Sequence, residues 1–180
     1  MKNVSGARSH EGRGPSNLLL STLSILLTAA VISIFSIALS EDVVDRMGGL
    51  HLLGARLDEL EMINSKSPKV FVGALTAFPA AVVLSLLTHR LSYRDWVQRI
   101  KSKAVGGCIK PVVLSSVLIS VIIYYLFWAS LLNPDGTGLN KTAITFHPYL
   151  MPLFASLCFH ALYYAFATIF FMVRKSEKNG

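Results

Sequence analysis

One side chain inside the long apolar stretches of this sequence could carry acid–base or metal chemistry, tyrosines and a cysteine aside, and it is His160. It lies near the middle of the stretch 149–173, on one helical stripe with Ser156. An ionisable residue within a membrane-spanning segment marks a functional site by default. A neutral histidine that is hydrogen-bonded to a neighbouring helix would instead serve packing alone, with Ser116, Ser120 and Tyr124 as the candidate partners. The sequence leaves both interpretations open.

The other residue patterns that indicate catalysis or a cofactor are missing from the sequence. Cys108 and Cys158 form no CxxC pair and have no zinc-ligand spacing. A haem held between helices needs two histidines at matching depth, and no second histidine lies within the apolar stretches. Neither HExxH, nor GxSxG, nor a P-loop is present. We therefore expect a protein that is not an enzyme and that holds no cofactor and no metal.

The composition points to a membrane protein. Of 180 residues 53% are hydrophobic and 15% are charged, and the mean hydropathy is +0.54, which is too apolar for a soluble domain of this size. A helix needs roughly 20 apolar residues to cross a bilayer. Four stretches meet this requirement: 18–40, 70–88, 111–132 and 149–173. They predict an all-α membrane protein, a four-transmembrane-helix bundle with an amphipathic helix in its first external loop.

The distribution of basic residues predicts the orientation of this bundle. Lys and Arg number 17, of which 12 lie in the tail 1–17, the connector 90–110 and the tail 174–180. Because positive charge stays on the cytoplasmic side, both termini and this connector should be cytoplasmic. The expected organisation is a disordered tail 1–17, a transmembrane domain 18–173 and a short tail 174–180. The net charge of +7 is then explained by anionic lipid headgroups, and no nucleic-acid partner is expected.

The first external loop, 41–69, contains the candidate binding surface. Leucines recur there at helical spacing while charged residues are expected on the other faces, which is typical of an amphipathic helix on the membrane surface or docked over the bundle. Gly48-Gly49 would hinge this helix from the first span. The candidate partner-binding residues are Leu53, Arg56, Leu57, Asp58, Glu59, Leu60 and Glu61. The alternative is a plain connector that lies on the surface.

Small and hydroxylated residues within the spans are the candidate helix-packing positions. The second span carries a ladder at intervals of four residues, Gly73, Ala77, Ala81 and Ser85. Such a ladder lets another helix approach closely. Pro79 should kink the same helix.

Two other spans carry hydroxyl stripes. Ser24 and Ser36 lie on separate hydroxyl stripes of the first span, and both stripes are expected to face other helices. The third span carries Ser116, Ser120 and Tyr124 on one stripe and ends before Asn133-Pro134-Asp135-Gly136.

Some features resemble a known family. A basic segment runs into Cys108 and Pro111, the third span ends in Tyr125-Leu126-Phe127, and a short basic tail follows an aromatic fourth span. Together with the four spans and the longer first external loop, these features resemble the immunity proteins that protect bacteria against A-type pore-forming colicins. The resemblance implies a protein without catalytic residues that binds the pore-forming domain of a toxin in the inner membrane.

Two other functions remain open from the sequence. The chain could be a small accessory or assembly subunit whose packing ladder contacts a larger membrane protein. It could also be a channel, transporter or membrane-embedded enzyme built around His160. The expected partners are thus the lipid bilayer and either a membrane-inserting toxin or a larger membrane protein.

Overall fold

The computed structural model describes residues 16–88, 109–132 and 138–177, and this part of the chain is helical apart from short connections. The elements are α1 (Ser16–Ala38), α2 (Glu41–Gly48), α3 (His51–Ile63), α4 (Ser67–Thr88), α6 (Ile109–Phe127), the 3-10 helix η2 (Lys141–Phe146) and α7 (Met151–Glu177). Of these, α1, α4, α6 and α7 are long and apolar enough to cross a membrane. The prediction of an all-helical chain with four such helices is confirmed at this level.

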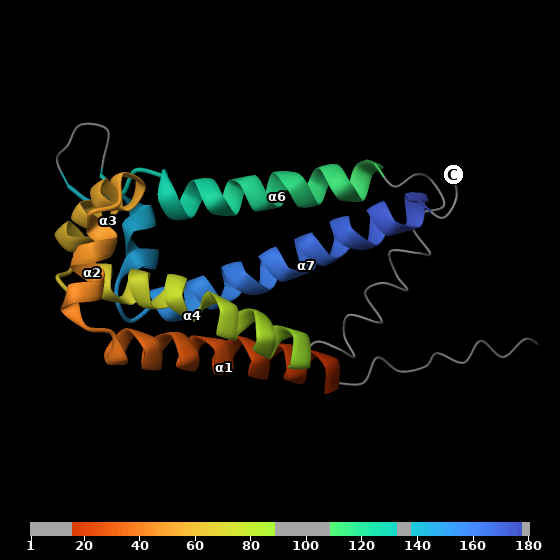
Figure 1. Cartoon of the computed structure of the whole chain (residues 1–180), viewed down its shortest axis with the longest axis horizontal. Helices are drawn as coiled ribbons and strands as arrows, with labels where there is room; N and C mark the ends of the chain where they lie inside the picture. The colour runs from red at the N-terminus through yellow and green to blue at the C-terminus, as the bar shows by residue number, and fades with distance from the viewer. Residues whose placement is uncertain (1–15, 89–108, 133–137, 178–180) are drawn as a thin grey trace, which may run out of the picture.

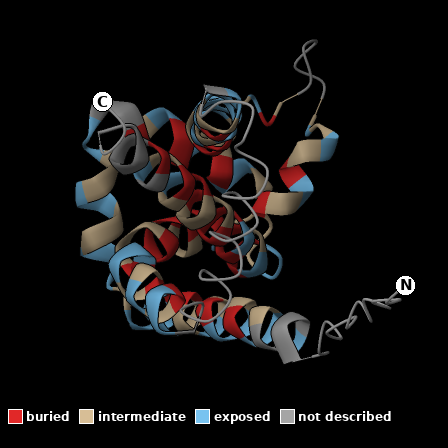
Figure 2. Ribbon diagram, turned by 90° about the vertical axis from the view of Figure 1, so that its right-hand side faces the viewer, coloured by how far each residue is buried: buried red, intermediate tan, exposed pale blue. Residues whose placement is uncertain are grey.

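The four long helices run side by side with alternating direction (Figure 1). Helices α1 and α4 pack against each other, α7 contacts both of them, and α6 packs against α7 on its other side. Because the direction alternates, all the described connections lie at one end. There α2, α3 and η2 form a cap, by which we mean residues 41–63 and 141–146. Buried residues gather along the centre of the molecule, and the outward faces of the helices are exposed (Figure 2).

The closest helix contact is between α1 and α4. All four residues of the small-residue ladder, Gly73, Ala77, Ala81 and Ser85, are buried. A Cβ added to Gly73 would lie 2.7 Å from the Cα atom of Ser36, so only glycine permits this backbone separation. Gly73 therefore lies in the interface with α1.

Pro79 lies inside α4 on its exposed side. The axis of α4 bends near its middle (Figure 1). Proline causes such bends because it has no amide hydrogen to donate to the preceding turn and its ring crowds that turn.

The loops and helix ends differ from the sequence-based prediction. The first loop contains two helices, because α2 ends at Gly48 and α3 begins at His51. The third long helix ends at Phe127 rather than at residue 132, and its last turn closes when Trp128 N and Ala129 N both donate to Tyr124 O. In the second loop η2 is capped by the preceding Asn140, whose side chain accepts hydrogen bonds from Thr142 N and Ala143 N. These differences arise from capping and tertiary contacts, which apolar length does not report.

The ends of the first and last helices also differ. Helix α1 includes residues 16 and 17, which were expected in the tail, and α7 continues to Glu177 rather than ending at residue 173. The rest of the N-terminal tail and most of the basic connector 90–110, with Cys108, lie outside the described residues.

Candidate functional site

Arg56 lies at the centre of the cap, in the middle of α3. The residue is 3% exposed. It follows Leu53 by three positions and precedes Leu60 by four, and both leucines are buried. Residues at these spacings share one face of a helix, so Arg56 belongs to the apolar face of α3. We expected Arg56 on another face of the helix, and this was wrong; its spacing from the leucines was the signal that could have placed it correctly.

The guanidinium of Arg56 binds the end of α6. Its Nε donates to Leu126 O at 2.9 Å, its Nη2 to Tyr125 O at 3.0 Å and its Nη1 to Ala129 O at 2.7 Å. Nη1 also donates to Glu59 Oε2 at 2.9 Å, which forms an ion pair within α3. One side chain of the cap thus joins α3 to α6.

These hydrogen bonds compensate for a loss that every helix end incurs. The last carbonyl groups of an α-helix have no amide donor within the helix, and α6 ends at Phe127. Arg56 supplies donors to two of these carbonyls and places a positive charge at the negative end of the helix dipole. Burial lowers the pKa of the Arg56 guanidinium, whereas the hydrogen bond and the charge of Glu59 raise it. Arginine keeps its proton in proteins because its pKa is so high.

Aromatic rings surround the Arg56 site. The Phe146 ring of η2 lies 4.5 Å from the Arg56 guanidinium carbon, a cation–π contact. Tyr125 of α6 stacks on Phe146 with ring centres 5.7 Å apart, and Phe154 of α7 is 5.4 Å from Tyr125. Phe71 of α4 contacts the Phe127 ring edge to face at 5.9 Å. The cap end is therefore the place where α3, α4, α6, α7 and η2 meet.

The predicted partner-binding residues of the first loop do not form one accessible surface. Leu53, Arg56, Leu57 and Leu60 are buried within the chain, Glu59 is half-buried, and Asp58 and Glu61 are exposed. The helical pattern was detected correctly, but its apolar face is covered by the rest of this chain. In this structure Asp58, Glu59 and Glu61 are the members of the set that a partner could reach.

His160 forms a second polar cluster, between α7 and α1. Its Nδ1 lies 2.8 Å from Ser156 O, and its Nε2 lies 2.9 Å from Ser24 Oγ. A carbonyl oxygen can only accept, so Nδ1 carries a hydrogen, and a neutral ring then accepts from Ser24 through Nε2. Ser156 Oγ donates to Ile25 O at 2.8 Å. The cluster joins the two helices, and its partner helix is α1 rather than the expected helix with Ser116, Ser120 and Tyr124.

Replacing His160 tests this structural interpretation. We expect His160→Leu to lower the free energy of unfolding by about 1 kcal/mol, because Ser24 loses a buried hydrogen bond within the bundle. The measurement is unfolding in mixed detergent micelles, followed by circular dichroism. His160→Gln, which retains a hydrogen-bonding side chain, should be less destabilised. If both variants were as stable as the wild type, the cluster would not hold α1 to α7.

Helix α6 differs from the other long helices in how it packs. Among the long helices α6 packs mainly against α7, whereas α1, α4 and α7 each pack against at least two others. Its buried residues Ser115, Ile122 and Leu126 lie on one side. Ser116, Ser120 and Tyr124 are all exposed. By the 3.6-residue period their stripe runs from the flank of this buried side at Ser116 to the opposite side at Tyr124.

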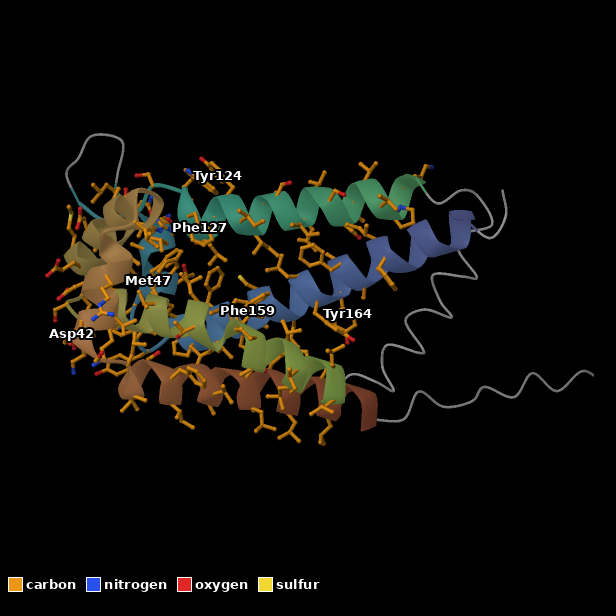
Figure 3. The ribbon with its side chains drawn as sticks, in the orientation of Figure 1. Asp42, Met47, Tyr124, Phe127, Phe159 and Tyr164 are labelled. Atoms are coloured by element: carbon orange, nitrogen blue, oxygen red, sulfur yellow. The ribbon has the colours of Figure 1, made fainter. Side chains whose placement is uncertain are left out.

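Figure 3 shows the two orientations at the cap end of α6. Tyr124 points away from α7, and Phe127 points inward, toward the other helices. The exposed stripe, Ser116, Ser120 and Tyr124, is called the α6 stripe below.

Within residues 16–88, 109–132 and 138–177 no three His, Cys, Asp or Glu side chains gather as a metal site would require. Comparison with known proteins finds no match. No family model, no curated protein and no solved structure is similar to this chain. The candidate functional sites are therefore the two polar clusters, around Arg56 and His160, and the α6 stripe. The clusters join helices of this chain to one another, whereas Ser120 of the stripe hydrogen-bonds within its own helix.

Proposed function

We propose that this protein resides in the bacterial inner membrane and binds a membrane-embedded partner through the α6 stripe. We further propose that the partner is the pore-forming domain of a bacteriocin, so that the protein acts as an immunity protein. The main observation behind the proposal is that Ser116, Ser120 and Tyr124 are exposed on α6, the long helix that packs against the fewest other long helices.

Polar side chains can hold two helices together in lipid. Helices in a bilayer gain little from apolar contact with each other, because lipid tails are equally apolar. Hydroxyl groups can instead hydrogen-bond across helices, at about 0.6 to 2 kcal/mol each. Ser120 Oγ donates to Ser116 O within α6 at 3.0 Å, which leaves its acceptor lone pairs available for a second helix. The α6 stripe is therefore suited to bind a helix of another protein.

The residues beside the stripe are also suited to pack against a helix. Val113, Val117 and Val121 are exposed beside it, and β-branched side chains at this spacing lose little entropy on packing. A pore-forming domain enters the membrane as an apolar helical hairpin, so it presents such a helix within the bilayer. In the proposed orientation both termini are cytoplasmic and the cap faces outward, where the toxin arrives.

The test of this function is the survival of cells. Cells that express residues 1–180 are challenged with the pore-forming toxin encoded beside the gene and with a panel of A-type colicins. Survival against one toxin, with killing by the others, is the expected result. Killing by every toxin, at wild-type levels of expressed protein, would contradict the immunity function. A companion membrane protein that co-purifies in equal amount without any toxin would identify an accessory subunit instead.

Enlarging the stripe should abolish protection without loosening the fold. We expect the double variant Ser116→Leu/Ser120→Leu to lose protection by at least about tenfold in surviving colonies, because 1.4 kcal/mol of lost binding is a factor of ten in affinity. Its thermal stability should be unchanged, because both positions are exposed.

The control is Ala30→Leu, which introduces one leucine at an exposed position of α1. It should protect like the wild type. Equal protection by the double variant and the control would exclude the α6 stripe as the binding surface.

A further inference from the structure

We infer that the cap controls the position of α6 through Arg56, so that movement of α3 changes how the α6 stripe is presented. This inference deepens the proposed function and rests on it for the role of the stripe. It concerns a regulatory contact: Arg56 is a positioning residue and touches no partner itself.

Arg56 joins the cap end of α6 to α3 through backbone carbonyls. Along the bundle α6 packs mainly against α7, through the side that holds Ser115, Ile122 and Leu126. A helix held along one side by a single neighbour can rock about that contact. At its cap end, two carbonyl oxygens of α6 and one just after the helix accept hydrogen bonds from the Arg56 guanidinium at 2.7 to 3.0 Å. The planar guanidinium fixes the direction of the helix end as well as its position.

The second step is that α3 is tied to the rest of the bundle independently of α6. Leu57 and Leu60 of α3 are buried, and α3 contacts α4, α2 and η2 as well as α6. Lys69 of α4 forms an ion pair with Glu41 of α2 at 3.0 Å. A displacement of α3 relative to α4 would therefore move the end of α6, which Arg56 holds. The packing of α1 on α4 does not depend on Arg56.

The third step is that the contact can be reached from outside. Glu59, which holds Nη1 of Arg56, has a side chain that is 29% exposed, and Asp58 beside it is exposed. A cationic segment of a partner that pairs with Glu59 would compete with Arg56 for the same carboxylate. The exposed acids of α3 and the buried arginine beneath them thus connect the outer surface of the cap to the end of α6.

The experiment measures distances between spin labels in lipid nanodiscs, in a variant with Cys108→Ala and Cys158→Ala. One pair, Leu27→Cys with Val113→Cys, reports on α1 against the far end of α6, and a control pair, Leu27→Cys with Val83→Cys, reports on α1 against α4. Val113 is 13 residues from Leu126, about 20 Å along the helix, so a tilt of about 10° would move it by roughly 3 Å.

In the Arg56→Met background we expect the α1–α6 distance distribution to shift and broaden while the α1–α4 distribution stays unchanged. Arg56→Lys, which retains the charge but lacks the planar fork, should show a smaller shift. Unchanged α1–α6 distances would overturn the inference. Changes in both pairs would also overturn it, because Arg56 would then hold the fold as a whole and not α6 in particular.

These measurements contain no toxin, so they are independent of the immunity function. If the wild type protects cells but Arg56→Met does not change the α1–α6 distance, only the coupling of α3 to α6 is refuted. An intact distance change without protection by the wild type would refute the immunity function alone.

Discussion

Replacing Arg56 with methionine is expected to lower the free energy of unfolding by about 2 to 4 kcal/mol. Methionine fills a similar volume but cannot donate, so Tyr125 O, Leu126 O and Ala129 O lose their donor together. Glu59 also loses its counter-ion. Groups left unpartnered in a buried site cost more than the hydrogen bonds themselves contribute. The measurement is unfolding in mixed micelles with increasing sodium dodecyl sulfate, followed by circular dichroism.

Lys69→Met is the matched control for this prediction. It also removes one cation of the cap that is paired with a carboxylate, but the partner Glu41 is 74% exposed and the pair joins α4 to α2 at the surface. Ion pairs of this kind contribute about 0 to 1 kcal/mol. Equal losses in the two variants would mean that the carbonyl contacts of Arg56 have no special weight.

The second large effect is expected in the interface between α1 and α4. Gly73→Val should lower the free energy of unfolding by about 3 kcal/mol, because even its first added carbon would lie 2.7 Å from the Cα atom of Ser36. The backbone of α1 cannot avoid this contact by a change of side-chain rotamer, so the two helices must separate. The same unfolding measurement applies.

Ala80→Val is the control for the glycine variant. It introduces the same residue seven positions further along α4, where Ala80 lines an open apolar depression with Val31 and Val83. The change there should stay within about 0.5 kcal/mol. A Gly73→Val variant as stable as this control would show that the close approach of α1 and α4 is not required.

The apolar lengths predicted the long helices well, because a stretch of roughly 20 residues without charge has few other stable solutions. They predicted the ends less well. Helix α6 ends at Phe127 although the apolar run continues to residue 132, because the end is set by the carbonyl contacts with Arg56. A residue 70 positions away in the sequence makes these contacts.

The candidate site shows the same division between local and tertiary information. The ladder from Gly73 to Ser85 is local, and its close-packed, small-residue character could be read from spacing. The partner of His160 is tertiary: α7 packs against both α1 and α6, and which of them His160 faces depends on how the four helices are arranged, which no spacing reports. Arg56 is an intermediate case, because its spacing from Leu53 and Leu60 placed it on the apolar face while its charge suggested the polar one.

The central claim, that the α6 stripe binds a pore-forming domain within the membrane, can be tested by photocrosslinking in living cells. A benzophenone amino acid is placed at Val117, which is 53% exposed beside the stripe, or at Leu27 of α1, which is 41% exposed. Cells are then challenged with the toxin against which the protein protects and are irradiated. We predict a covalent adduct with the toxin from position 117 and none from position 27. Adducts from both positions in equal amount, or from position 27 alone, would contradict the claim.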